Sequence, residues 1–506
     1  MDEKYKVDTD LFLRKLSEQI SKYSLIQSLF GLKTYIKSKS KVKEPVFTYN
    51  NNQTMGYHVF PFIIDRFIRT CTNSKPELFL TNLLIDWVID KYRNFSEMEE
   101  SYKSKEHLRK RTYETLIRIS YEQFGYQETN RTLVPRALYL YKEIPNSNTE
   151  KHSSFVNSIN LVCEKLFRVD IEELLFGTFL ITAEGDLKLY FKKHLTIDDS
   201  LKDKVPNPDT INIILEQFSI SPEEYLKESY KRDSTSTAFI KNYPFVIFDF
   251  PIIRFRDFCV LPYPQLLLSR VTDRLDTAIC EFDNSNREKG KYIDSFGEVF
   301  SEYIGLLLYD CSNKNRVYDL DKIPNYSRER ADWLITSGKS VIIFECKSQR
   351  YKYSLKSTGN LDELDSFMSN RLRKPIKQLI NTENQIRDDV INFPNIKSSF
   401  TCHKVIVVLE NFHFANLLFD CLPDNREIRN LQKYNIHIIS VLDLEVLLTS
   451  NFSRQIVDIL ESWFKNISEF PILRQYIFSK KNYKKDKNNI LDHKLNKFFG
   501  TKNRNL

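Results

Sequence analysis

The sequence predicts a mixed fold of the α+β or α/β class, with a helical N-terminal region and a C-terminal region in which helices and strands alternate. Two patterns predict it. Apolar residues of the first half recur at the spacing of amphipathic helices, whereas short β-branched runs separated by helical stretches dominate after residue 290. The 506 residues suffice for about three domains, and only 11 of them are glycines, too few for repetitive glycine-rich β architectures.

The N-terminal domain is expected to span residues 1–205 and to be helical. A first apolar stripe follows Asp10, and the capping box Ser74-Lys-Pro-Glu77 predicts another helix that begins near Ser74. The polar stretch 198–209 contains two prolines and predicts the boundary that ends this domain.

Residues 206–290 are expected to connect the two regions and to carry a small β unit at about 243–265. This stretch is dense in aromatic and β-branched residues, which favour strands. Pro251 lacks the N–H that a ladder hydrogen bond needs, so its strand is expected at the edge of a small antiparallel sheet. A helix is predicted to follow over 266–281.

Residues 291–478 are expected to form one domain. A one-sided hydrophobic stripe predicts its first helix, and a Ser-Gly-Lys turn between two apolar runs predicts a β-hairpin. The predicted order is α-β-β-β-α-β-α-β, with a helix at 294–308, strands at 316–320, 331–336 and 341–347, a helix at 369–390, a strand at 405–409, a helix at 414–419, a strand at 436–441 and a helix that opens at Asp443.

The formal net charge of +8 lies almost entirely in the C-terminal tail, residues 479–506. The tail has nine Lys and Arg against two Asp, a net charge of +7. Such a tail is compatible with an arm that binds a polyanion and equally with a solubilising chain end. The charge therefore permits a nucleic-acid partner without requiring one.

Composition argues against several classes of protein. The longest apolar runs, such as 303–309, are far shorter than the roughly 20 residues of a membrane span, and the first residues lack the apolar core of a signal peptide. The eight cysteines include no CxxC pair and the eight histidines no HExxH pattern, so neither a zinc site nor a disulfide framework is expected. A cytoplasmic protein with reduced thiols and no membrane partner is predicted.

The run Val341 to Lys347 carries the candidate chemistry. Alternate side chains of a strand share a face, so Glu345 and Lys347 emerge together, while Cys346 faces apolar packing on the other side. Asp332 lies on the preceding strand, where its carboxylate can meet that of Glu345. Two clustered carboxylates repel each other unless a cation or a proton lies between them. Oxygen ligands without His or thiolate select Mg²⁺ or Mn²⁺.

These residue types fit the hydrolysis of a phosphodiester. A divalent cation can polarise a phosphoryl oxygen and acidify a bound water. Lys347 can orient that water and stabilise the pentacovalent transition state. The sequence therefore predicts metal-dependent hydrolysis at the end of this strand.

Asp332, twelve intervening residues and then Glu345-Cys346-Lys347, within the predicted α-β-β-β-α-β order, resemble the PD-(D/E)XK nuclease superfamily of restriction-endonuclease-like folds. The resemblance covers roughly residues 290–450, and Ala331 replaces the proline of the motif. It implies a metal-dependent endonuclease that cleaves DNA. Asp332, Glu345 and the backbone carbonyl of Cys346 would be the ligands of Mg²⁺ or Mn²⁺, and Lys347 would be the catalytic lysine.

The resemblance also implies supporting residues and a setting. Such families often place an acid in the first helix, for which Glu302 or Glu298 is available, and a glutamine in the helix after the lysine strand, for which Gln378 is the candidate. A helical region in front of such a domain resembles bacterial restriction or anti-phage defence effectors. A homodimer, or a partner protein of a defence system, is compatible with this assignment because double-strand cleavage usually needs two sites.

Two alternatives remain open. The same metal site would serve an RNA nuclease or a DNA-repair nuclease, because it acts on any phosphodiester. The fold could instead serve as a non-catalytic nucleic-acid-binding module. Loss of Asp332, Glu345 or Lys347 would be typical of such a module, and all three are present.

Overall fold

The computed structural model of the chain forms two compact units, each built from two stretches of sequence. The first unit comprises Met1–Leu133 and Asn157–Arg287, and the second comprises Val134–Val156 and Glu288–Leu506. The structure describes residues 3–39, 46–49, 53–57, 59–71, 82–101, 110, 112–114, 116–117, 130–193, 209–233, 245–272, 274–285, 291–311, 316–323, 329–337, 339–348, 350–351, 355–356, 359–388, 399–411, 418–451, 455–467, 469–470, 472–484 and 489–499.

These units differ from the expected division at 205 and 290. The expected regions 1–205 and 206–290 fall largely into one unit, and the stretch Val134–Val156 belongs to the other. The boundary expected within 198–208 lies outside the described residues. A segment belongs to the unit whose other segments it packs against. Local composition does not specify these packing partners.

The first unit is predominantly helical, as predicted. Most residues of its helix α3 are buried, with Phe60, Phe62 and Phe67 fully so, because neighbouring helices cover it on several sides. The helix start expected near Ser74 lies outside the described residues. The helices are α1 (Glu3–Ile20), α2 (Leu25–Lys39), α3 (Val59–Thr70), α4 (Asn82–Ser101), α8 (Ser153–Val162, from Asn157 onward in this unit), α9 (Ile171–Leu187), α10 (Thr210–Phe218), α11 (Pro222–Asp233), α12 (Pro264–Val271) and α13 (Leu275–Ser285), and the unit also has an antiparallel pair of strands, β1 (Val46–Tyr49) and β2 (Gln53–Gly56).

The small β unit is a four-stranded sheet of the order β3-β6-β5-β4. Strand β5 (Ile252–Arg254) lies inside this sheet, so the edge position expected from Pro251 is wrong. Pro251 precedes the strand and takes no part in its ladder, which is why it does not confine β5 to an edge. The other strands are β3 (Phe191–Lys192), β4 (Ser219–Ile220), which runs parallel to β5, and β6 (Phe258–Val260).

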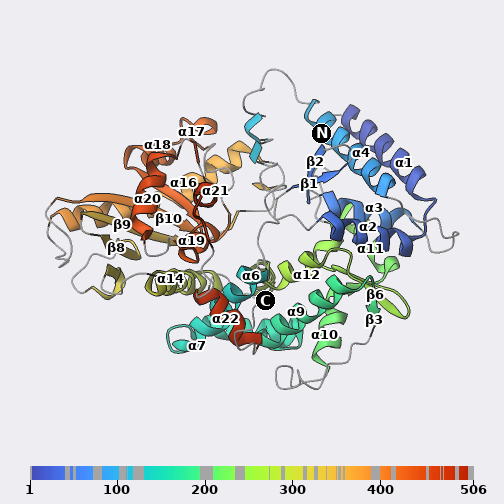
Figure 1. The fold of residues 1–506 in the computed structure, drawn as a ribbon, viewed down its shortest axis with the longest axis horizontal. Helices are drawn as coiled ribbons and strands as arrows, with labels where there is room; N and C mark the ends of the chain where they lie inside the picture. The colour runs from blue at the N-terminus through green and yellow to red at the C-terminus, as the bar shows by residue number, and fades with distance from the viewer. Residues whose placement is uncertain are drawn as a thin grey trace. The chain divides into compact units, whose positions relative to one another are not determined.

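The second unit is built around a five-stranded mixed sheet of the order β11-β10-β9-β8-β7. Strands β8, β9 and β10 of this sheet are labelled in Figure 1. The strands β7, β8 and β9 are antiparallel neighbours, and β9, β10 and β11 run parallel. The predicted mixed α/β character and the predicted strands are confirmed. They are β7 (Val317–Asp319), β8 (Trp333–Ser337), β9 (Ser340–Lys347), β10 (Thr401–Val408) and β11 (Ile436–Ser440).

The described helices of the second unit follow the predicted order with local differences, and most of the helix predicted at 414–419 lies outside the described residues. Asn360 caps α16, so this helix begins well before the predicted residue 369. Ser440 caps α19, and Asp443 closes the capping box from inside the helix instead of opening it. The sequence did not predict helix α18. Among the described helices, none is both long and apolar enough to cross a bilayer. The helices are α6 (Asn130–Leu138), α7 (Ile144–Ser147), α14 (Lys291–Cys311), α16 (Leu361–Arg387), α17 (Leu418–Cys421), α18 (Arg426–Lys433), α19 (Val441–Leu448), α20 (Ile456–Lys465), α21 (Leu473–Ser479) and α22 (Ile490–Phe499).

Helices cover both faces of the five-stranded sheet. The Trp333 Nε1–H donates to the carbonyl of Ser301 on α14 at 2.9 Å, so α14 covers the face of Trp333. Lys404 forms an ion pair with a glutamate of α16, so α16 covers the face of Lys404. These are opposite faces of the sheet. Trp333 pairs with Phe344 and Lys404 pairs with Ile343, and the side chains of these two consecutive residues of β9 point to opposite faces.

Arg136 ties the stretch Val134–Val156 to the core of the second unit. Its guanidinium donates to both carboxylate oxygens of Glu445, from Nε at 2.7 Å and from Nη2 at 2.5 Å. The hydroxyl of Tyr303 also donates to Glu445, at 2.6 Å. A buried carboxylate is tolerated here because its charge is paired and its oxygens are hydrogen-bonded.

Part of the basic tail is packed. Helix α22 buries Leu491 and Phe498, and Lys494 forms an ion pair with Glu143 and lies 5.4 Å from the centroid of the Tyr139 ring. The tail stretches 485–488 and 500–506 lie outside the described residues. Some of the positive charge of the tail is therefore engaged within the second unit.

Candidate active site

Glu345 and Lys347 share one face of strand β9, as the alternation of the strand predicts. The Lys347 Nζ donates to Glu345 Oε1 at 2.5 Å. Glu345 is 1% exposed, and the side chain of Lys347 is 23% exposed, so the pair lies at the point where the strand leaves the core. The apolar residues 341–344 keep this part of β9 inside the sheet, and the charged pair follows directly after them.

Asp332 is held beside the end of β9 by two backbone contacts. Its N–H donates to the carbonyl of Phe344 at 3.1 Å, which places Asp332 at the entry of β8. Its Oδ2 accepts the N–H of Cys346 at 2.6 Å. The structure thus brings Asp332 and the Glu345-Cys346-Lys347 segment together, although twelve residues separate them in the sequence.

The site holds two carboxyl groups that lack enough compensating charge. Burial raises the pKa of Asp332 to about 6, and Lys347 and the Cys346 N–H oppose this rise. Burial, followed by the charge of Asp332, raises the pKa of Glu345 well above its usual range. Burial also disfavours the charge of Lys347, but its pKa is raised because Glu345 and Asp332 stabilise the ammonium. One ammonium group does not offset two desolvated carboxylates.

The second carboxylate oxygen of Glu345 is not satisfied by the described residues. Glu345 Oε2 is buried and has no hydrogen-bond partner among the described residues. A divalent cation with a preference for oxygen ligands would satisfy this atom and the Asp332 carboxylate together. No group of three or more His, Cys, Asp or Glu side chains in the described part of the chain is arranged for a metal. The side-chain ligands offered here are therefore Asp332 and Glu345, and a main-chain oxygen such as that of Cys346 would complete the set.

Gln378 lies on α16 and supports the segment that leads into Asp332. Its Nε2 donates to the carbonyl of Arg330 at 2.6 Å, and its Oε1 is buried without a hydrogen-bond partner in the described structure. One turn later, the Thr382 hydroxyl accepts the N–H of Ala331 at 2.9 Å. The contacts of Gln378 therefore position the entry of β8, two residues before Asp332.

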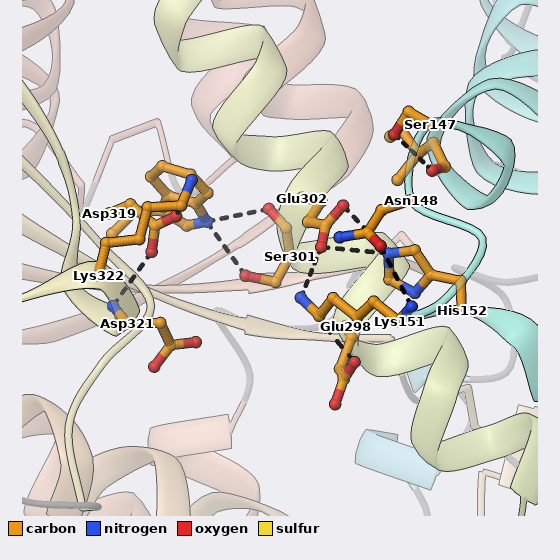
Figure 2. A network of polar contacts seen from close by, with 12 residues as sticks. Ser147, Asn148, Lys151, His152, Glu298, Ser301, Glu302, Asp319, Asp321 and Lys322 are labelled. Atoms are coloured by element: carbon orange, nitrogen blue, oxygen red, sulfur yellow. Dashed lines mark hydrogen bonds and ion pairs between the residues drawn. The ribbon is translucent and has the colours of Figure 1, made fainter.

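Glu302 and Glu298, the two candidates for the first-helix acid, take part in a different network (Figure 2). Glu302 accepts a hydrogen bond from Lys151 at 2.6 Å, and its oxygens lie 3.2 Å from Nε2 of His152. Glu298 lies 3.9 Å from the same lysine. Among the described residues, the hydrogen bonds and ion pairs of Glu302 reach none of Asp332, Glu345 and Lys347. The reason is that α14 covers the face of the sheet opposite to Glu345.

Two charged residues that sequence reasoning missed act on the site. Asp321 adds to the rise in the pKa of Asp332, and the N–H of the preceding Leu320 donates to the Asp332 carbonyl at 3.0 Å. Lys374 on α16 opposes the rise in the pKa of Glu345. The basic run that ends at Lys374, one helical turn before Gln378, is a sequence signal for the lysine. Asp321 has no such signal, because its position depends on the pairing of β7 with β8.

Comparisons with known proteins add no relative. No family model matches the chain, and neither the curated proteins nor the solved structures contain a match. A functional proposal for this chain therefore starts from its own residues and their geometry.

Proposed function

We propose that the second unit is a metal-dependent nuclease that hydrolyses phosphodiester bonds of DNA. The observation that carries this proposal is the buried Glu345 carboxylate, which has one orphaned oxygen and lies beside Asp332 and Lys347. Two clustered carboxyl groups with raised pKa values and an adjacent lysine are groups that metal-dependent phosphodiester hydrolysis can use.

Asp332, Glu345 and the backbone carbonyl of Cys346 would hold Mg²⁺ or Mn²⁺. Such an ion, when bound, supplies positive charge for the phosphoryl oxygens and lowers the pKa of a coordinated water. All the atoms offered are oxygens, which favours these two cations over zinc. The cysteine thiol is not among them, because burial raises the pKa of Cys346 well above its usual range and keeps the thiol protonated.

The chain's own residues have distinct tasks in this proposal. The Cys346 N–H fixes Asp332 through the 2.6 Å hydrogen bond, so that one carboxylate oxygen is oriented before any ligand arrives. Lys347 is partly exposed and bonded to Glu345, a position from which its ammonium can hold the attacking water and stabilise charge on the phosphoryl group. The buried surroundings of Glu345 keep bulk water away and strengthen these interactions.

The sheet of the second unit supports a restriction-endonuclease-like core. A helix precedes three antiparallel strands, the hairpin of β8 and β9 carries Asp332 and Glu345, and α16 leads into strands that continue the sheet in parallel. This order and the Asp-(twelve residues)-Glu-Cys-Lys spacing are why we assign the unit to the PD-(D/E)XK nuclease superfamily. A setting in bacterial restriction or anti-phage defence rests on the resemblance of the whole chain to such effectors.

A polyanionic substrate is favoured by the exposed side of α16. Arg373 and Lys374 are exposed and form no ion pair with any described residue. Lys374 is close enough to Glu345 to influence its pKa. Phosphate groups that approach the site would therefore meet positive charge that is not held in an ion pair with a described residue.

Cleavage assays test the proposal directly. Purified protein is incubated with plasmid, linear duplex, single-stranded DNA and RNA, in Mg²⁺, Mn²⁺ or EDTA. We expect cleavage of DNA in Mg²⁺ or Mn²⁺ and none in EDTA. Cleavage of RNA alone would assign the same site to an RNA nuclease. Binding of these substrates without cleavage under any condition would overturn the enzyme assignment and favour a binding module.

A further inference from the structure

A cleft of about 530 Å³ opens at one end of the four-stranded sheet in the first unit. Lys193 follows β3, Ser221 follows β4, and the turn from Arg254 to Phe258 joins β5 to β6. These segments meet because β4 is parallel to β5, and both β3 and β5 are antiparallel to β6. The volume is in the range of small-molecule sites, roughly 300–1,000 Å³.

Positive side chains line this cleft. Lys193 and Arg256 are exposed and form no hydrogen bond or ion pair with any described residue. Arg254 is held by Glu224 at 3.3 Å. Burial raises the pKa of the neighbouring Cys259 thiol to about 11, and both Arg254 and Lys193 oppose that rise, so their charges act on the same place. The two free cations are available to an anionic ligand.

Aromatic rings lie next to these cations. Phe255 and Phe258 line the cleft and stack on each other with centroids 4.9 Å apart and planes at 22°. Tyr190 packs edge-on against Phe258 at 5.4 Å and is 53% exposed. The N–H of Phe255 donates to the carbonyl of Phe258 at 2.8 Å, which closes the turn and fixes the rings. A nucleotide can bind to such a surface because its base stacks on an aromatic ring and its phosphate pairs with positive charge.

Other polar groups at the cleft limit which ligand fits. Glu223 and Asp257 also line it, so a strongly acidic ligand must lie on the side of Lys193 and Arg256. The start of α11 is already occupied, because Ser221 and Glu224 cap each other there at 3.0 and 3.2 Å. Recognition of an anion must therefore come from side chains and not from the helix end.

We propose that this cleft binds a nucleoside phosphate, with its phosphate against Lys193 and Arg256 and its base stacked on Phe255. Inorganic phosphate would use only the cations, and a nucleoside only the ring. The inference concerns the first unit and does not depend on nuclease activity in the second.

Titration calorimetry with the full chain tests this site. The titrations contain EDTA, so that no cation is available to the proposed metal site. The probes are AMP, UMP, ribose 5-phosphate, adenosine and inorganic phosphate. We expect AMP and UMP to bind, and ribose 5-phosphate to bind about tenfold more weakly because it lacks a base to stack. Absence of nucleotide binding at millimolar concentration, or equal affinity for AMP and ribose 5-phosphate, would overturn the proposal.

Charge variants locate the binding. We expect Arg256→Gln and Lys193→Gln each to weaken AMP binding about tenfold, and Glu223→Gln to strengthen it. The matched control is Lys165→Gln, which removes an exposed cation of the same unit that pairs with Glu164, away from the cleft. If Arg256→Gln and Lys193→Gln bind AMP as Lys165→Gln does, the cleft is not the site.

A ring variant separates stacking from charge. Phe255→Leu keeps an apolar side chain but removes the aromatic face, so we expect weaker binding of AMP and unchanged binding of inorganic phosphate. Equal loss for both probes would mean that the variant disturbs the turn. The ratio of the AMP affinity to the ribose 5-phosphate affinity then decides, because loss of the ring should abolish the preference for AMP whether or not the turn shifts. An unchanged preference for AMP in Phe255→Leu would refute stacking on this ring.

Discussion

Two buried glutamates of the second unit differ in how well their carboxylates are satisfied. Glu445 receives two hydrogen bonds from Arg136 and one from Tyr303. Glu345 is similarly buried, but among the described residues only Lys347 bonds to it, and its Oε2 has no described partner. A desolvated carboxylate that is not fully satisfied lowers stability, and such residues concentrate at functional sites. The contrast supports a structural role for Glu445 and a functional one for Glu345.

Substitutions at the site should therefore affect cleavage more than folding. We expect Glu345→Gln and Lys347→Ala to lower the cleavage rate at least roughly 100-fold, because in the proposed nuclease these groups act on the transition state. Glu345→Gln should not lower the melting temperature, since the amide removes a desolvated charge. The control is Lys339→Ala, an exposed lysine of the same hairpin, which should cleave at the wild-type rate. Wild-type turnover in Glu345→Gln would contradict the assignment.

His437 predicts a loss of stability in acid. Burial lowers its pKa to about 3, with a further contribution from His403 and Lys404, and its ring stacks on Phe464 at 4.0 Å. The folded protein keeps His437 neutral, whereas the unfolded chain takes up a proton below about pH 6.5. Stability from this residue is thus present above pH 6.5 and is lost as the pH falls towards 3.

The expected effect is about 2 kcal/mol at pH 5 relative to pH 7. His437→Phe keeps a ring against Phe464 and cannot be protonated, so its urea-unfolding free energy should fall less between these pH values than that of the wild type. His493→Gln, which removes an exposed histidine of α22, serves as the control. Parallel pH profiles for the wild type and His437→Phe would show that His437 does not titrate in this way.

Helix α14 illustrates how one element depends on the absence of a side chain. A Cβ at Gly305 would lie 2.0 Å from Cζ2 of Trp333, whereas a Cβ at Gly297 would meet only the Ser348 hydroxyl at 3.7 Å. Gly305 thus allows α14 to approach β8, and Trp333 directly follows the site residue Asp332. Close packing of this helix is therefore a condition for the geometry of the site.

The two glycines give a matched pair of variants. We expect Gly305→Ala to destabilise the protein by about 2 kcal/mol or more, because Trp333 must move. Gly297→Ala should stabilise it by roughly 0.5–1 kcal/mol, the gain in helix propensity. Urea unfolding of both variants measures the difference. Equal stability of the two would mean that Trp333 is not constrained by α14.

At the scale of the whole chain, Arg136 and Glu445 join segments 309 residues apart in the sequence. We expect Arg136→Met to lower the unfolding free energy by about 3–5 kcal/mol, because Glu445 would keep a buried charge without a partner. The double variant Arg136→Met/Glu445→Gln should recover much of this loss, since the amide can still accept from Tyr303. Urea unfolding of the single and double variants tests the coupling. Additive losses would show that the pair is not coupled.

Local patterns were sufficient for the elements that carry the candidate site. The spacing of Val299, Phe300 and Tyr303 predicted α14, and all three are fully buried. The alternation along β9 predicted that Glu345 and Lys347 share a face, and the two side chains are in contact. Both patterns act over fewer than two turns or a few strand residues, so the backbone geometry alone enforces them.

Burial between segments that are far apart in the sequence decided the features that local patterns did not predict. The sequence by itself determined the mixed class, most strands of the second unit and the shared face of Glu345 and Lys347 at the end of β9. Only the tertiary structure assigned Val134–Val156 to that unit, paired Glu302 with Lys151 and His152, and placed β5 inside its sheet. Periodicity specifies which face of an element is apolar, but not which other segment covers that face, because many partners bury similar area at similar free energy.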